Sequence, residues 1–194
     1  QAQGVLNGCV NDVKMMRDYI KSTGFTDANI RVLADDVNLT RTAPTGAEIV
    51  KALAWLVKGA KKGDSLFFHY SGHGSQQKDA TGDEDDGMDE TLVPLDYAAN
   101  GCITDDTLFQ LMVAPLPAGV SLTCVFDCCH SGTILDLPFL FSATEESCAA
   151  LSNGEDLEMA LNPRFDMDVA KALVSGIAKG VFNQVIKSKL KAGS

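Results

Sequence analysis

The chain has 194 residues, of which 45% are hydrophobic and 22% are charged, and it carries a formal net charge of -10. This length and mix suit one globular domain with a sizeable core. The acidic balance argues against a nucleic-acid partner, and no apolar run of about 18 residues predicts a membrane span.

Helical and extended patterns alternate along the chain. Thr45 and Glu48 form a capping box at the start of one helix, and a short apolar run predicts a buried strand at 65–70. In chain order, we expect a helix over 11–23, a strand at 29–33, a helix from Thr45 to near Gly59, a strand at 65–70, an acidic loop over 74–90, a helix over 105–113, a strand at 120–127, an irregular stretch over 141–165 and an amphipathic helix over 167–190.

The six cysteines show no zinc-binding spacing, and a disulfide framework does not suit a chain of this length. Most of them fit the role of small buried hydrophobic residues. We therefore expect a reducing compartment, the cytoplasm.

Strands that alternate with helices favour a mostly parallel α/β sheet, in which sites gather beyond the carboxyl ends of the strands. Two predicted strands end in segments that could carry chemistry. One continues into Ser71-Gly72-His73-Gly74, and the other ends in Asp127 and continues into Cys128-Cys129-His130. If the two strands are neighbours, these side chains meet at one edge of the sheet.

The two strand ends supply a thiol and a base. A cysteine thiol is mostly protonated at neutral pH, so a nucleophilic cysteine needs a base or a cationic neighbour. Cys129 and His73 fit these roles, and their separation is close to the roughly 50-residue His-to-Cys spacing of caspases. Backbone N–H groups near Gly74 and Cys129 could supply an oxyanion hole.

Each of these residues also has a structural alternative. A histidine or a cysteine at a strand end often only packs or hydrogen-bonds. We interpret His69, inside the apolar strand, as a packed core residue. His130 competes with His73 as the base, but its position next to Cys129 would point its side chain away from the thiol.

Several ordered motifs resemble the metacaspases, which are caspase-fold cysteine proteases of plants, fungi, protists and bacteria. The two signature segments are His69-Tyr70-Ser71-Gly72-His73-Gly74 and Asp127-Cys128-Cys129-His130-Ser131-Gly132, and residues 8–13, 89–96 and 103–106 also match the family. The resemblance covers roughly residues 5–140, and the Q-A-C-x-G motif of caspases is absent. It implies a caspase-like three-layer α/β/α sandwich around a mostly parallel sheet, incomplete in this chain.

The resemblance implies a calcium-dependent cysteine endopeptidase that cleaves protein or peptide substrates after arginine or lysine. The family's nucleophile directly precedes His-Ser-Gly, which selects Cys129 over Cys128, with His73 as the base. Its acidic specificity pocket corresponds to Asp12 and Asp127, lined by Cys9 and Ser71. A helix N-terminal cap is the structural alternative for Asp12.

The family's calcium site corresponds to four aspartates of this chain, namely Asp89, Asp105, Asp106 and Asp136. Carboxylate oxygens are the ligands that calcium prefers. Asp105 and Asp106 could equally be first-turn helix acids, and the acidic residues 83–86 could merely solvate a loop.

The resemblance also divides the chain into a catalytic large-subunit region over 1–140 and a linker-like part over 141–194. The usual opening strand and the small-subunit region are not recognisable, so a separate small-subunit fragment is a candidate partner of an otherwise monomeric protein. Self-cleavage would fit Arg164 or Lys187, Lys189 and Lys191. Three other functions stay open: a catalytically silent calcium-responsive scaffold, a redox-sensing thiol protein, and a related peptidase of other specificity.

Overall fold

The computed structural model describes residues 4–78, 87–135, 137, 139–140, 144–154 and 160–161. In chain order its elements are α1 (Cys9–Ser22), η1 (Asp27–Asn29), α2 (Gly46–Val57), β1 (Ser65–Ser71), β2 (Gly74–Lys78), β3 (Met88–Leu92), α3 (Tyr97–Asn100), β4 (Ile103–Thr104), α4 (Asp105–Leu108), η2 (Phe109–Val113), β5 (Ser121–Asp127), β6 (Phe139–Leu140), α5 (Glu145–Ser152) and β7 (Ala160–Leu161). None of the described helices is long and apolar enough to cross a membrane.

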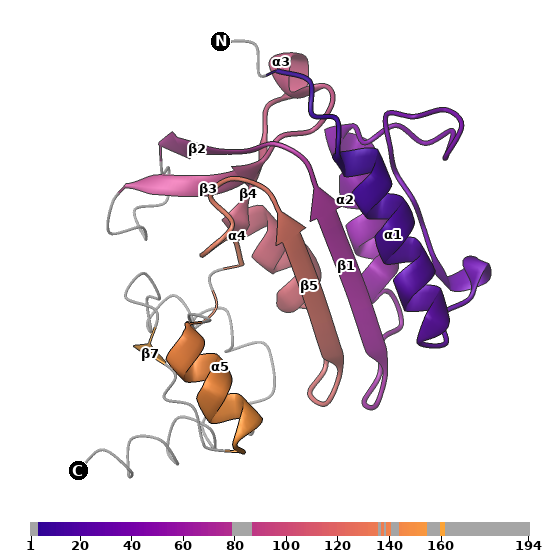
Figure 1. Ribbon diagram of the computed structural model, residues 1–194. Helices are drawn as coiled ribbons and strands as arrows, with labels where there is room; N and C mark the ends of the chain where they lie inside the picture. The colour runs from indigo at the N-terminus through magenta and orange to yellow at the C-terminus, as the bar shows by residue number, and fades with distance from the viewer. Residues whose placement is uncertain are drawn as a thin grey trace.

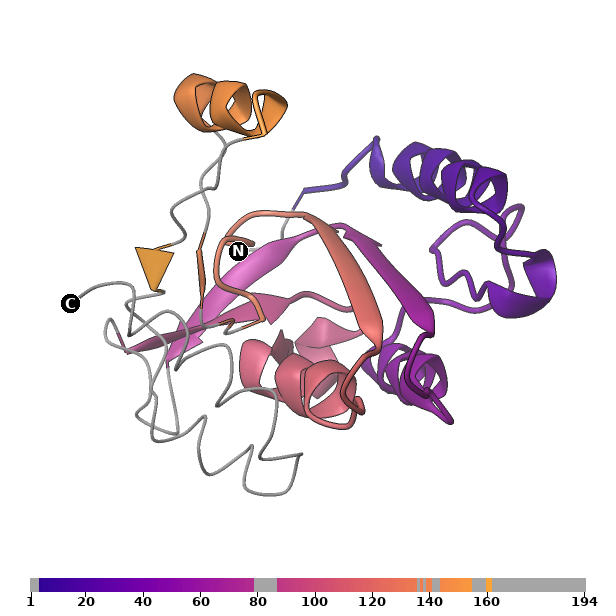
Figure 2. The ribbon, with the colours of Figure 1, turned by 90° about the horizontal axis from the view of Figure 1, so that it is seen from below.

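The centre of the fold is the parallel pair of strands β1 and β5 (Figure 1). They run in register from the pair Ser65–Ser121 to the pair Ser71–Asp127. Helix α1 lies on one face of this pair, and α2, α4 and η2 lie on the other face (Figure 2). This three-layer arrangement confirms the predicted α/β fold class and the positions of the two central strands, whose residues are partly rather than fully buried.

A second sheet replaces much of the loop that the sequence predicts over 74–90. Strands β2 and β3 pair antiparallel, and β4 pairs antiparallel with β3. Gln76 is hydrogen-bonded to Glu90 across the first pair, with a distance of 3.2 Å from Nε2 to Oε1. The prediction of a loop is wrong at both ends of this range. Polar residues pair here through their backbones, and strands of this kind show no alternation of apolar residues in the sequence. Residues 79–86 lie outside the described part of the chain.

The hydrophobic core fills the space between the sheets and the α2 side. Leu53 of α2, Leu92 of β3, Leu108 of α4 and Met112 of η2 are all exposed to 1% or less. Helix α1, on the opposite face, contributes no fully buried residue. The two faces of the central strands therefore differ: one is packed as a core, and the other stays partly open.

Most predicted helices are confirmed. Helix α2 begins after Thr45, whose side chain accepts a hydrogen bond from the backbone N–H of Glu48, as the capping box predicts. The predicted helix over 105–113 is α4 followed by η2, which continues as a π-helical segment, and Thr104 caps it.

Two predictions of local structure are wrong. The stretch 29–33 is not a strand: Ile30 has extended backbone angles, but no described strand pairs with this stretch. A strand needs a partner, and propensity alone does not supply one. The stretch expected to be irregular contains α5, which Thr144 caps by accepting a hydrogen bond from the N–H of Ser147. The helix predicted over 167–190 lies outside the described residues.

We predict that Thr45→Ala lowers the free energy of unfolding by about 1 kcal/mol, because the first turn of α2 loses its side-chain acceptor. Urea denaturation followed by circular dichroism measures the change. The matched control is Thr26→Ala, since Thr26 precedes η1 without a capping hydrogen bond from its side chain. Equal losses in both variants would contradict the prediction.

Candidate active site

The carboxyl ends of β1 and β5 lie against each other, as the sequence predicts. The N–H of Gly72 donates to the carbonyl oxygen of Asp127 at 3.2 Å, which extends the strand pairing by one residue. Gly74 is buried, and a Cβ atom at this position would overlap the carbonyl oxygen of Cys129. Only glycine allows this approach, and it brings the backbone beside His73 to the backbone of Cys129.

Backbone and tyrosine groups hold His73 from two sides. Its Nε2 atom lies 2.6 Å from the carbonyl oxygen of Gly4. Its own carbonyl oxygen accepts a hydrogen bond from the Tyr70 hydroxyl at 2.8 Å and another from the Val93 N–H at 3.1 Å. If Nε2 carries the proton and donates to Gly4, Nδ1 keeps the lone pair that a base needs.

Neither Gly4 nor Tyr70 is among the site residues that the sequence predicts. A backbone carbonyl leaves no signal in residue type, so nothing in the sequence could have indicated Gly4. Tyr70 carries a weak signal, because a buried tyrosine hydroxyl usually finds a hydrogen-bond partner. Burial also raises the pKa of Tyr70, so its hydroxyl stays protonated and able to donate.

The two adjacent cysteines have different surroundings. Cys128 is half-buried and packs against the core cluster, and burial raises its pKa to about 11. Cys129 is exposed at the end of the strand. His130, which follows it, has a left-handed backbone with φ of 56° and an exposed side chain. Accessibility therefore favours Cys129 over Cys128 as the reactive thiol.

The predicted specificity residues lie on the face of the sheet that carries α1. Ser71 Oγ donates a hydrogen bond to Asp12 Oδ2 at 2.8 Å, and Asp127 is the register partner of Ser71. Cys9 is the first residue of α1, one turn before Asp12. Asp12 lies inside the helix, and Gly8 occupies the N-cap position, so the alternative that Asp12 is the cap is wrong.

A cavity of about 250 Å³ continues from this acidic end along the same face. It is lined by Asp12, Met15, Met16, Tyr19, His69, Val125 and Asp127. Our interpretation of His69 as a packed core residue is wrong, because alternate residues of a strand face opposite sides and His69 faces the cavity. Burial lowers the pKa of His69, while the carboxylates of Asp12 and Asp127 raise it to a lesser extent. A larger cavity of about 620 Å³ lies along β5 and contains neither His73 nor Cys129.

The aspartates implied as calcium ligands are only partly brought together. Asp89 and Asp105 are 4% and 2% exposed. Asp105 is tied to the protein by its own hydrogen bonds, because its two oxygens accept the N–H groups of Glu90 and Asp106. Asp136 lies outside the described residues. Within the part of the chain that the structure describes, no group of three or more acidic, histidine or cysteine side chains could hold a metal ion.

Comparisons with known proteins point to one family. A model of the metacaspase, peptidase C14 domain matches residues 1–138. Metacaspase-1 of Mycosarcoma maydis is 43% identical over 98% of this chain and 47% of its own length. Metacaspase III c of Phaeodactylum tricornutum is 49% identical over 84% of this chain and 46% of its own length.

A solved structure shares the fold. A crystal structure of a protein from Geobacter sulfurreducens matches with a TM-score of 0.53 and 34% identity, over 69% of this chain and 45% of that chain. The present chain therefore spans less than half the length of the relatives named here.

We predict that Gly74→Ala disrupts the meeting of the two strand ends, because the added methyl group overlaps the Cys129 carbonyl oxygen. The expected loss is about 1–3 kcal/mol of unfolding free energy. Thermal denaturation measures it. Gly132→Ala is the matched control, since a Cβ there meets nothing within 4 Å, and it should change stability by less than about 0.5 kcal/mol. An unchanged Gly74→Ala variant would refute the close approach.

Proposed function

Because the chain belongs to the metacaspase family of C14 peptidases, we propose that it is a cysteine endopeptidase with Cys129 as nucleophile and His73 as base. Its proposed substrates are proteins or peptides with arginine or lysine at the cleaved bond. The observation that carries the proposal is the contact at Gly74, which joins the strand end bearing His73 to the strand end bearing Cys129.

The proposed reaction has two stages. His73 takes the proton of the Cys129 thiol, and the thiolate attacks the substrate carbonyl carbon to form a tetrahedral oxyanion. This intermediate collapses with loss of the amine, which leaves with the proton from His73, and a thioester remains. Water then attacks the thioester while His73 accepts its proton, and the thiol leaves with that proton.

The position of Gly4 and Tyr70 suits this use of His73. A donor contact to the Gly4 carbonyl fixes the ring orientation, and the Tyr70 and Val93 bonds fix the backbone behind it. Such support reduces the motion that a loop histidine would otherwise have. The proposal therefore assigns Gly4 and Tyr70 to positioning, and not to proton transfer.

Charge supports a basic specificity. Asp12 and Asp127 line the 250 Å³ cavity on the α1 face. Two carboxylates can bind a guanidinium in a fork-like arrangement, and the aliphatic stem of an arginine suits the neighbouring Met16 and Val125. An aspartate side chain would instead meet two like charges.

Calcium binding is a second part of the proposal. Buried carboxylates are costly unless hydrogen bonds or a cation compensate their charge, and oxygen ligands suit calcium. Asp89 and Asp105 would contribute such ligands, with Asp106 and Asp136 as further ones. A bound calcium ion would supply positive charge to these carboxylates and thereby stabilise the segments that carry them.

The remaining expectations follow from the same proposal. Part of the relatives' length lies outside this chain, so a separate small-subunit fragment stays a proposed partner. The net charge of -10 argues against a nucleic-acid partner, and the monomeric state and cytoplasmic location stay proposals. Arg164, Lys187, Lys189 and Lys191, the proposed self-cleavage positions, lie outside the described residues. The main alternative function is a catalytically silent calcium-responsive scaffold.

The first prediction from this proposal concerns the two cysteines. Cys129→Ala should reduce cleavage of a fluorogenic peptide ending in arginine below about 0.1% of the wild-type rate, because the variant lacks the exposed thiol beyond the end of β5 that the proposal assigns as nucleophile. Cys128→Ala should keep the rate within about threefold, since Cys128 is half-buried and its pKa is raised to about 11.

The assay also separates the competing functions. Peptides ending in arginine, lysine, asparagine and aspartate are compared, with and without calcium. Turnover of the basic peptides alone supports the proposed specificity, and turnover of the aspartate peptide contradicts it. A wild-type chain that binds calcium but cleaves none of the peptides would favour the scaffold. A fully active Cys129→Ala variant would overturn the assignment of the nucleophile.

The second prediction concerns calcium. At a calcium concentration about 100 times the Kd, binding should stabilise the wild-type protein by about 2.7 kcal/mol. Asp89→Asn should remove most of this gain, because it replaces a buried carboxylate by a neutral amide of the same shape. Thermal denaturation and isothermal titration calorimetry measure the effect. Asp18→Asn, on the exposed surface of α1, should retain the full gain. Equal calcium affinity in both variants would rule out Asp89 as a ligand.

A further inference from the structure

His69 has a place in the cavity that the proposed mechanism does not use. Along β1, Phe68 and Tyr70 pack against the core, whereas His69 and Ser71 face α1. In the parallel register, His69 lies beside Val125, two residues before the Ser71–Asp127 pair and on the same face of the sheet. The imidazole therefore lies on the wall of the cavity directly behind the residues assigned to substrate specificity.

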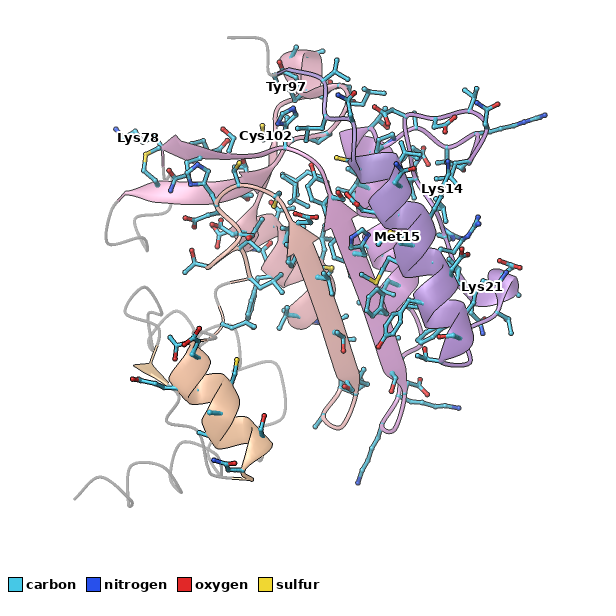
Figure 3. The ribbon with its side chains drawn as sticks, viewed as in Figure 1. Lys14, Met15, Lys21, Lys78, Tyr97 and Cys102 are labelled. Carbon is cyan, nitrogen blue, oxygen red and sulfur yellow. The ribbon has the colours of Figure 1, made fainter. Side chains whose placement is uncertain are left out.

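The groups that face His69 come from two elements. Helix α1 contributes Asp12 and Tyr19, and β5 contributes Asp127. Met15, which Figure 3 labels on α1 beside the sheet, adds an apolar wall together with Met16 and Val125. Tyr19 is 60% exposed. The charged neighbours of His69 in this cavity are thus two carboxylates.

This environment sets two charge states for the cavity. Burial lowers the pKa of His69, so the ring is mostly neutral at pH 7 and the cavity then carries the two negative charges of Asp12 and Asp127. In weak acid the ring gains a proton, and the imidazolium then faces the side chains of Asp12 and Asp127. The imidazolium then neutralises part of the charge that a substrate cation would use.

We propose that His69 is a specificity-determining residue whose protonation weakens the binding of a basic substrate side chain in the cavity formed by Asp12 and Asp127. The inference rests on the proposed function. A bound guanidinium and a protonated His69 compete for the same two carboxylates and repel each other. Protonation of His69 at low pH therefore weakens the binding of the guanidinium, and a bound guanidinium lowers the pKa of His69. Because the two equilibria are linked, both effects have the same coupling factor.

Binding of a small probe tests this without the chemistry of cleavage. The probe is n-propylguanidine, which reproduces the arginine side chain, and n-propylurea is its neutral control. Between pH 7.5 and pH 5.0 the affinity of the wild-type protein for n-propylguanidine should fall about tenfold, within the usual range of coupling between sites. In His69→Gln the change should be less than about twofold. The matched control His130→Gln, at an exposed position, should behave as the wild type.

A second measurement needs no substitution at His69. The chain has three histidines, so their ring signals can be followed by NMR across pH, and His73→Asn and His130→Gln assign the signal of His69 by elimination. Saturating n-propylguanidine should lower the pKa of His69 by about one pH unit, which corresponds to a tenfold coupling. The neutral n-propylurea should leave it unchanged.

The outcomes separate the two proposals. If n-propylguanidine binds and arginine peptides are cleaved, but His69→Gln keeps the tenfold pH dependence or the probe leaves the His69 pKa unchanged, the inference about His69 is overturned and the proposed function stands. If the probe does not bind at pH 7.5 and no basic peptide is cleaved, the proposed function fails and the inference fails with it.

Discussion

The parallel pairing of β1 with β5 is the constraint on which the rest of the structure depends. Because Ser71 lies opposite Asp127, both strands end at the same level of the sheet. The residues that follow, His73 and Cys129, then leave the sheet at one edge. A shift of this register by one residue would turn every side chain of the strand to the opposite face and separate the two ends.

Successive side chains of β1 and β5 point to opposite faces of the sheet, and this separates the residues that pack in the core from the polar residues near the site. Phe68, Tyr70 and Phe126 pack against the core on the α2 side, and the rings of Phe68 and Phe126 lie 5.5 Å apart. Polar residues of the strands, among them His69, face α1. Packing on the α2 side fixes the position of the strands. The α1 side can therefore hold charged groups in fixed positions although it contributes little to the core.

Several supports of the site come from the backbone. The carbonyl of Gly4 contacts His73, the N–H of Val93 binds the carbonyl of His73, and Gly74 approaches the carbonyl of Cys129. Val93 directly follows strand β3, which carries the buried Asp89. Strand β3 thus leads from the acidic region to the residue that supports His73, which gives a physical route by which the proposed calcium ion at Asp89 would affect the order of the site.

The sequence by itself determined the two central strands, the cap at Thr45, and the position of His73 and Cys129 just beyond the strand ends, because apolar runs, capping residues and strand-end motifs are local patterns. Only the tertiary structure decided the conformation and surroundings of residues whose role depends on contact with another segment of the chain. The stretch 29–33 stays unpaired and the polar ends of 74–90 form strands, since pairing depends on what lies beside a segment. His69 likewise belongs to the cavity because the pleat of β1 turns it towards Asp12 and Asp127, which a single strand pattern cannot reveal.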